Sequence, residues 1–339
     1  MRLTQLEYDL PDNLIAREPL DPRDQARMLV LDRQTGALEH ARFYKLPRFL
    51  REGDLLVLNN TRVLPARLIT RKESGGEVEL LMVRPADTSP GAWIALARTH
   101  RALREGTRLL LPDGRVLIVV GYQRPGRPLI ARADGLPMED LLRESGMLAL
   151  PHYIDREVNP GDAANYQTVY ADPPGAIAAP TAGLHFTEAL FSELATAGIR
   201  TALLTLHIGP GTFTPVRAPA IEQHSMEAEW YTIPPATVAA VELAQRVGGR
   251  VIGVGTSSAR ALESWAITGD TEGFTGLFIF PGFRFKRVDA MITNFHMPRS
   301  TVLALVMALA GRETILRAYN DAIRHRYRFL SYGDAMLIL

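Results

Sequence analysis

The chain has 339 residues, of which 47% are hydrophobic and 22% are charged, with no cysteine and a formal net charge of +1. This length indicates roughly two domains and a core large enough to fold without cross-links. The lack of cysteine excludes disulfides, iron–sulfur clusters, thiolate zinc sites and cysteine nucleophiles.

The beginning of the chain does not have the pattern of a signal peptide, because acidic residues recur within "MRLTQLEYDLPDNLIAREPL". The longest late apolar run, "TVLALVMALAG", is about half a membrane span and indicates a buried helix. We therefore expect a cytoplasmic protein that has no membrane partner. We also expect a monomer, although these features do not determine the oligomeric state.

Residues 55–135 predict a small antiparallel β-barrel that follows a mixed segment, residues 1–54. Short strand-like runs surround two hairpin signals, Gly75-Gly76 and Asp113-Gly114. The barrel segment carries 13 Lys and Arg against 7 Asp and Glu, so it is basic. This surplus indicates either an anionic partner or a chance cluster on a solvated surface, and both interpretations stay open.

Helical and strand-like patterns alternate from residue 187 to the end of the chain. This alternation predicts helices packed on a largely parallel sheet. The Pro- and Gly-rich stretch that precedes it is long enough to be functional or to mark a domain junction. We therefore predict an α/β fold: a large domain, residues 1–54 and 136–339, has a largely parallel or mixed sheet covered by helices, and the antiparallel barrel is inserted into it.

Three predicted strands end in turns of the kind that bind ligands in α/β sheets. "LTLHIGPGTFTPV" follows its strand with His207, Gly209, Gly211, Thr212 and Phe213. "VIGVGTSSARALE" opens a helix with Thr256, Ser257 and Ser258, whose N-terminus suits a carboxylate or phosphate. This second turn matches neither the dinucleotide fingerprint nor the phosphate-binding loop. "MITNFHMPRST" places Asn294, Phe295 and His296 between a strand and a helix.

A fourth stretch, "APTAGLHFT", places His185 between Leu184 and Phe186 just before a helix. His185, His207 and His296 thus all lie in turns next to the end of a predicted strand or the start of a predicted helix. None of them has the spacing of a metal-ligand motif, so the sequence predicts no metal site. Each histidine is either a hydrogen-bonded structural residue or a proton carrier, and the residues alone leave both alternatives open.

Long motifs in this chain resemble the S-adenosylmethionine:tRNA ribosyltransferase-isomerase family of queuosine biosynthesis. The motifs are "YDLPDNLIAREPLDPRDQARMLVLDR", "LVLNNTRVLPARL", "YQTVYA", "PTAGLHFT", "LHIGPGTFTPV", "GGRVIGVGTSSARALE", "LFIFPGFRF", "ITNFHMPRST" and "YRFLSYGDAML". They follow the family's order over essentially the whole chain. Two small departures are Pro210, where the family has an aliphatic residue, and the pair Asn59-Asn60, where the family has Asn-Asp.

The resemblance implies an α/β domain with an inserted barrel and an unusual transfer reaction. In this reaction S-adenosylmethionine is a consumed substrate that donates its ribosyl carbons. The acceptor is 7-aminomethyl-7-deazaguanine at the wobble position of tRNA with a GUN anticodon. The products are epoxyqueuosine in tRNA, adenine and methionine, and the family implies no metal or redox cofactor.

This chemistry needs a base, because the sulfonium acidifies the C5′ protons of the ribose and one of them must be removed. We expect His185 to be the base, with His296 the second candidate and His207 the third. The expected substrate-binding residues are Thr181, Gly183, Gly209, Gly211, Thr212, Phe213, Ser257, Ser258, Arg260, Asn294 and Phe295. Glu229 and Asp334 are candidate carboxylate partners, and Arg62 and Arg67 are candidate contacts to the tRNA backbone.

Two other classes of function fit parts of the sequence. One is an S-adenosylmethionine-dependent RNA methyltransferase, which would release S-adenosylhomocysteine rather than adenine and methionine. The other is a tRNA-binding protein without activity, which the basic segment permits but which leaves the three histidines unexplained.

Overall fold

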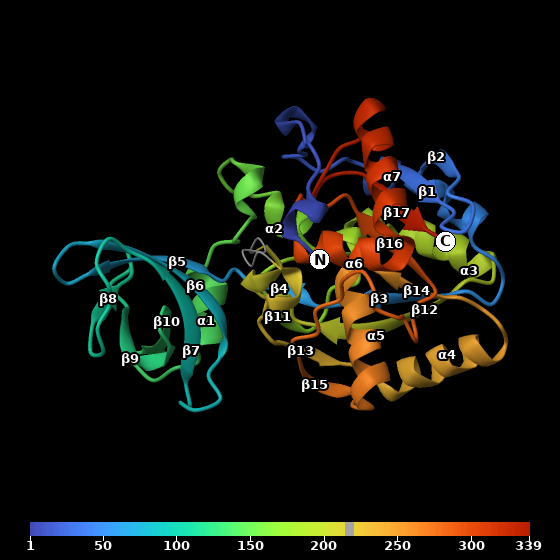
Figure 1. The fold of residues 1–339 in the computed structure, drawn as a ribbon. Helices are drawn as coiled ribbons and strands as arrows, with labels where there is room; N and C mark the ends of the chain where they lie inside the picture. The colour runs from blue at the N-terminus through green and yellow to red at the C-terminus, as the bar shows by residue number, and fades with distance from the viewer. Residues whose placement is uncertain (214–219) are drawn as a thin grey trace.

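The computed structural model describes residues 1–213 and 220–339, with the side chains of Thr212 and Phe213 left out of the description. A small barrel lies to one side of a larger α/β body, and the two meet along one flank of the body (Figure 1). No helix within the described ranges has both the length and the apolar composition needed to cross a membrane.

The body is built on a mixed sheet of nine strands, counted over the described residues. Their spatial order is β15 (Glu272–Thr275), β13 (Glu229–Thr232), β12 (Arg200–Leu206), β3 (Leu55–Asn59), β14 (Val251–Val254), β16 (Ala290–Asn294), β17 (Ala335–Ile338), β1 (Arg27–Leu31) and β2 (Leu38–Arg42). The central strands β12, β3, β14 and β16 run parallel to one another. The outer strands β13, β15 and β2 pair antiparallel, as does β17 with β16.

Both faces of this sheet are covered, because alternate residues of a strand point to opposite sides. Leu55 and Val57 of β3 pack under the helices on one face, whereas Leu56 and Leu58 belong to the core on the other. The first face carries α4 (Pro235–Arg246), α5 (Thr256–Thr268), α6 (Thr301–Ala310) and α7 (Arg312–Arg324). The second carries α3 (Glu188–Thr196) and the 3-10 helices Phe43–Phe49 and Thr181–His185.

The barrel closes with antiparallel pairs throughout. Its strands are, in order, β10 (Arg127–Arg132), β7 (Ala92–Arg98), β6 (Glu77–Pro85), β5 (Arg67–Lys72), β8 (Arg108–Leu110) and β9 (Val116–Arg124). Helix α1 (Met138–Ser145) contributes Leu141 and Leu142 to the barrel core. Two short strands, β4 (Arg62–Val63) and β11 (Pro174–Ala176), pair with each other, and α2 (Asp162–Asn165) lies in the connecting segment. The predicted fold class, a helix-covered mixed sheet with a small antiparallel barrel, is confirmed.

One strand lies elsewhere than the sequence analysis placed it. Residues 55–59 were expected in the barrel segment, but they form β3 at the centre of the large sheet. All five residues of β3 are buried, which is typical of a parallel strand covered on both faces. Helix α1 was expected in the large domain, but its apolar residues complete the barrel core instead.

Candidate active site

The carboxyl ends of the four central parallel strands meet at one edge of the large sheet. Strand β3 ends at Asn59, β12 leads to His207, β14 to Gly255, and β16 ends at Asn294. Ligands of open α/β sheets bind at this kind of edge. Three hollows that share lining residues with their neighbours lie there, which we call the inner pocket, the neck and the cleft.

The inner pocket is an apolar hollow with a few polar groups in its wall. Its lining includes Tyr153, Thr181, Ile208, Ser257, Asn294, Phe295, His296, Ser300 and Ser331. Its cavity volume of about 100 Å³ is below the ~300–1,000 Å³ of usual ligand pockets. The inner pocket therefore holds only part of a substrate as large as a nucleoside derivative.

Asn294 organises one wall of the inner pocket. The Thr181 hydroxyl donates to its Oδ1 at 2.7 Å, and its Nδ2 donates to the Leu330 carbonyl at 3.3 Å. The same Nδ2 faces Nε2 of His185 at 3.4 Å. This amide thus links two pocket-lining segments to a histidine that stands behind it.

His185 lies behind the inner-pocket wall rather than in it, so the favoured base of the sequence analysis has no direct place in this pocket. The residue is 4% exposed, and its ring lies 4.9 Å from that of Phe43. Burial lowers the pKa of His185 to about 4, although a hydrogen bond with the Arg23 backbone opposes the shift. The neutral ring accepts a hydrogen bond from Asn294 and thereby orients this pocket-lining amide.

His296 lines the inner pocket directly. Its Nε2 lies 2.7 Å from the Thr293 hydroxyl, and its backbone N–H donates to the Tyr319 hydroxyl at 3.1 Å. The Tyr8 hydroxyl donates to its carbonyl. Burial lowers the pKa of His296 to about 3, so the ring is neutral at pH 7 and can accept a proton.

Two helix N-termini converge on the inner pocket and supply partial positive charge. Ser257 in the first turn of α5 and Ser300, the N-cap of α6, both line it. Ser258 does not, because it is fully buried and its hydroxyl donates to the Val254 carbonyl at 2.8 Å. Ser258 therefore does not bind substrate as expected; its hydroxyl bonds to the last residue of β14 instead.

Asn59, which the sequence analysis noted only as part of an unusual pair, holds this edge together. Its Nδ2 donates to the Leu206 carbonyl at 2.9 Å and to the Ser257 hydroxyl at 3.1 Å. Its Oδ1 accepts the backbone N–H groups of Thr61 and Leu206. The buried amide thus joins the ends of β3 and β12 to the start of α5. The sequence signal for this role was the position of Asn59 at the end of a buried, apolar strand.

The neck is a narrow hollow beside the inner pocket, and a buried ion pair forms one side of it. The Arg260 guanidinium pairs with the Glu229 carboxylate, with side chains 5% and 4% exposed. Glu229 also accepts the backbone N–H of Gly209 at 2.7 Å. Arg260 is thus committed to Glu229 rather than free for a ligand carboxylate or a tRNA phosphate. The buried Thr301 hydroxyl in the neck wall has no hydrogen-bond partner among the described residues.

The cleft separates the barrel from the body and has a volume of about 840 Å³. Its lining includes the basic and aromatic side chains of Arg62, Arg84, Trp93, Arg143, His207, Trp230 and Phe274, together with the acidic side chains of Asp87, Glu139, Asp172, Glu227 and Glu229. The aromatic rings and the arginines suit nucleic acid, since bases stack on aromatic rings and phosphates pair with arginine.

His207 belongs to the cleft and is held rigidly there. Its ring stacks on Trp230 with centroids 5.1 Å apart, and its Nδ1 lies 2.8 Å from the Thr61 hydroxyl. A Cβ on Gly175 would lie 2.6 Å from the ring, so only glycine fits against its other side. Burial lowers the pKa of His207 to about 4, so this ring is also neutral at pH 7.

The remaining expected site residues are dispersed. Gly183 packs against Tyr170, where a Cβ would clash with the hydroxyl, so it serves packing rather than binding. Phe295 forms pocket wall from within an aromatic cluster. Gly209 lines the cleft, and Gly211 lies near Glu227 in a neighbouring hollow.

Three expected residues lie outside these hollows or outside the description. The carboxylate of Asp334 accepts the backbone N–H groups of Arg27 and Arg328, so it fixes the C-terminal turn. Among the residues of the first turn after β12, the side chains of Thr212 and Phe213 lie outside the described part of the chain.

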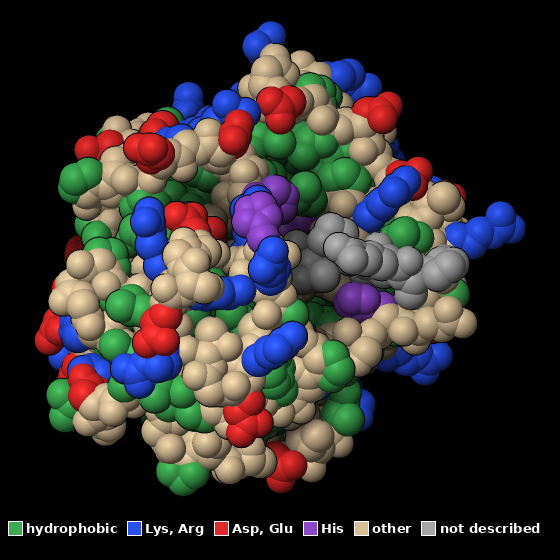
Figure 2. Space-filling view, turned by 90° about the vertical axis from the view of Figure 1, so that its left-hand side faces the viewer, with side chains coloured by type: hydrophobic (Ala, Val, Ile, Leu, Met, Phe, Trp, Pro, Cys, Tyr) green, Lys and Arg blue, Asp and Glu red, His purple; other side chains and the backbone are tan. Residues whose placement is uncertain are grey.

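The two arginines expected to contact tRNA differ in availability. Arg62 is exposed in the cleft and donates to the carbonyls of Ala171 and Asp172, whereas Arg67 pairs with Glu79 at 2.9 Å. Four other exposed barrel arginines form no ion pair within the described ranges, namely Arg71, Arg98, Arg101 and Arg104. Viewed from the barrel side, basic side chains are interspersed with acidic ones rather than gathered in one patch (Figure 2).

Comparisons with known proteins match the whole chain. The family model described as "Queuosine biosynthesis protein" matches residues 3–338. A Rubrobacter xylanophilus protein named S-adenosylmethionine:tRNA ribosyltransferase-isomerase is 50% identical over 100% of this chain and 98% of its own. A Geobacter sulfurreducens protein of the same name is 47% identical over 100% of both chains. The crystal structure of S-adenosylmethionine tRNA ribosyltransferase from Thermotoga maritima matches with 34% identity and a TM-score of 0.57, over 99% of this chain and 100% of that one.

Proposed function

This chain belongs to the queuosine biosynthesis protein family. On that premise we propose which part of the ribosyl-transfer substrates each of its three hollows binds. The resemblance seen in the sequence motifs is confirmed, and the alternatives of a methyltransferase and an inactive binding protein are not favoured. The enzyme is a transferase that moves and isomerises the ribosyl group of S-adenosylmethionine onto a modified base of tRNA. The whole-length family match carries this conclusion.

In our proposal the methionine end of S-adenosylmethionine enters the inner pocket. Its carboxylate lies at the N-termini of α5 and α6, near Ser257 and Ser300, because free N–H groups and the helix dipoles favour an anion there. The pocket is too small for the whole molecule, so the nucleoside extends toward the neck and cleft. The Thr301 hydroxyl, which has no hydrogen-bond partner in the part of the chain that the structure describes, is then available to the substrate.

The acceptor base enters the cleft in the same proposal. The rings of Trp230 and Phe274 offer stacking faces, and Arg62 and Arg143 lie where phosphates would pass. The acceptor is 7-aminomethyl-7-deazaguanine at the wobble position of tRNA with a GUN anticodon. The enzyme works as a cytoplasmic monomer without a membrane partner, and S-adenosylmethionine is consumed rather than acting as a cofactor.

His296 takes the place of His185 as the proposed base. A neutral ring that donates from Nε2 to the Thr293 hydroxyl keeps its lone pair on Nδ1, which can remove a proton from C5′ of the ribose. The resulting carbanion attacks the deazaguanine ring, after which adenine and methionine leave. The apolar pocket keeps water from the carbanion, while His185 holds Asn294 in place.

Product analysis tests this function. Purified enzyme is incubated with tRNA carrying 7-aminomethyl-7-deazaguanine and S-adenosylmethionine labelled in the ribose. We expect label in the tRNA nucleoside together with equal amounts of free adenine and methionine. Release of S-adenosylhomocysteine would instead mean methyl transfer, and binding without any product would mean a tRNA-binding role.

The exposed, unpaired arginines of the barrel give a prediction for tRNA affinity. We expect Arg101→Ala and Arg104→Ala each to raise KM for tRNA several-fold with little change in kcat, because each removes one ion pair with a phosphate remote from the reacting atoms. The slope of log affinity against log salt should fall by about 0.7–0.9 for each phosphate ion pair removed. Steady-state kinetics at several salt concentrations measure both effects.

Arg246→Ala is the matched control for this experiment. Arg246 is an exposed arginine at the end of α4, which lies on the side of the body away from the barrel (Figure 1). An equal loss of tRNA affinity in this variant would show that net charge, rather than a barrel contact, controls binding.

A further inference from the structure

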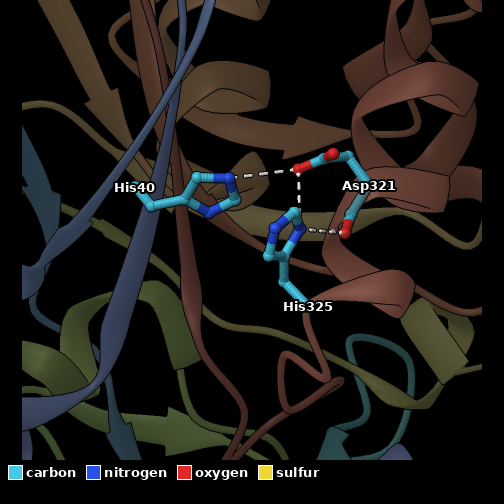
Figure 3. A group of neighbouring side chains, drawn as sticks. All are labelled: His40, Asp321 and His325. Atoms are coloured by element: carbon cyan, nitrogen blue, oxygen red, sulfur yellow. Dashed lines mark hydrogen bonds and ion pairs between the residues drawn. The ribbon is translucent and has the colours of Figure 1, made fainter.

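Two histidines and an aspartate meet on the body at a place that none of the three hollows includes. His40 comes from edge strand β2, Asp321 from α7, and His325 directly follows α7 (Figure 3). The ligand-capable atoms of the three side chains all lie within 4.8 Å of one another. From this geometry we propose that the cluster binds a divalent transition metal of the zinc type.

The separations match those in a metal site. Nε2 of His40 lies 3.2 Å from Oδ2 of Asp321, and Nδ1 of His325 lies 3.3 Å from the same oxygen. Tetrahedral zinc with bonds of about 2.0–2.2 Å places neighbouring ligand atoms about 3.3–3.6 Å apart, so the two separations lie at or just below the lower end of this range. Oδ2 is buried and accepts no hydrogen bond from any described residue, so the two ring nitrogens approach it without the alignment of a hydrogen bond.

Groups around the cluster fix its members in the way that outer-shell partners of metal ligands do. Nδ1 of His40 lies 2.9 Å from the Tyr327 hydroxyl, and Nδ1 of His325 lies 2.9 Å from the Asp321 carbonyl. The other carboxylate oxygen, Oδ1 of Asp321, accepts from Arg324 at 2.9 Å. Nε2 of His40 is free of these bonds and faces Oδ2. Nδ1 of His325 faces both Oδ2 and the Asp321 carbonyl, so a metal ion bound at this nitrogen would replace its bond to the carbonyl.

The ligand types and the exposure indicate which ion the cluster takes. Imidazole and carboxylate together suit zinc, whereas magnesium and calcium prefer oxygen alone. The side chains of His40 and His325 are 39% and 54% exposed, so water can complete the coordination. The nearby guanidinium of Arg324 opposes a cation, so we expect weaker binding than at closed four-ligand zinc sites.

The position of the cluster indicates a structural role for the ion. It would join β2, at the edge of the large sheet, to the end of α7. The sequence shows only the spacing of Asp321 and His325, four residues apart on one helix face, because His40 is far away along the chain.

Zinc titration of the tag-free, chelator-treated enzyme tests the proposal, with competition by a chromophoric chelator to give the affinity and stoichiometry. We expect one zinc ion per chain, and an affinity more than about tenfold weaker in the double variant His40→Ala/His325→Ala. Zinc should also raise the unfolding temperature of the wild type but not of this variant. Both histidines are partly exposed, so the unfolding temperature without zinc should confirm that the variant folds.

The matched control is the double variant His100→Ala/His152→Ala, which removes two exposed histidines outside the cluster. It should bind zinc as the wild type does. The proposal fails if the wild type binds no zinc below about 1 mM, or if the cluster variant retains wild-type affinity.

Discussion

We expect His296→Gln to lower kcat by about 10²–10⁴-fold while changing the affinity for S-adenosylmethionine only slightly, as befits loss of a general base. Glutamine keeps a polar side chain near the Thr293 hydroxyl but cannot take up a proton at neutral pH. Single-turnover kinetics with labelled S-adenosylmethionine separate the chemical step from binding and product release.

The pH profile of the wild type supplies a second readout. Burial lowers the pKa of His296 to about 3, so its ring stays neutral as the pH falls from 8 to 5. An ordinary histidine, with a pKa of about 6.5, would be largely protonated at pH 5 and would lose its function as a base. We therefore expect no fall in kcat near pH 6.5 from protonation of this residue.

His185→Gln is the comparison that separates a base from a positioning residue. Because His185 acts through Asn294, we expect this variant to lose activity through both kcat and KM, and by less than His296→Gln. If His185→Gln proves the more damaging and His296→Gln retains turnover, the order of the two histidines must be reversed.

The sequence predicted the edge of the sheet at which the site forms, because that edge follows from local pattern. Apolar runs that end in glycine or polar residues mark the ends of β12, β14 and β16, and parallel strands bring such ends together. The covered strand β3 has the same pattern, "LLVLNN", but the sequence analysis grouped it with the strand-like runs of the barrel segment. The unbroken apolar run was the better indicator of where this strand lies, because a parallel strand covered on both faces has this pattern.

The roles within the site were harder to predict, because they depend on which side of a wall a side chain faces. His185 and His296 have similar local contexts, yet one stands behind Asn294 and the other lines the pocket. Likewise, nothing in "TSSAR" indicates that Ser257 lines the pocket whereas the Ser258 hydroxyl bonds back to the end of β14. These differences arise from helix rotation and from partners distant in the chain.

The ion pair of Arg260 with Glu229 should dominate the stability of the neck. We expect Arg260→Met to lower the free energy of unfolding by about 3–5 kcal/mol, because it removes a buried guanidinium that pairs with the buried Glu229 carboxylate. The Leu277 carbonyl, which accepts from Nε of Arg260 at 3.1 Å, also loses its donor. Urea unfolding followed by tryptophan fluorescence measures the loss.

Two further variants decide whether the loss comes from the unpaired charge. Replacing both partners, as in Arg260→Met/Glu229→Leu, removes the buried carboxylate together with the guanidinium and should recover much of the stability. Arg67→Met breaks the partly exposed pair with Glu79 on the barrel and should cost at most about 1 kcal/mol. If Arg260→Met instead keeps wild-type stability and only raises KM for S-adenosylmethionine, then Arg260 binds substrate, as the sequence analysis expected. The buried pair, which also holds the Gly209 turn through Glu229, is the reason to expect the structural outcome.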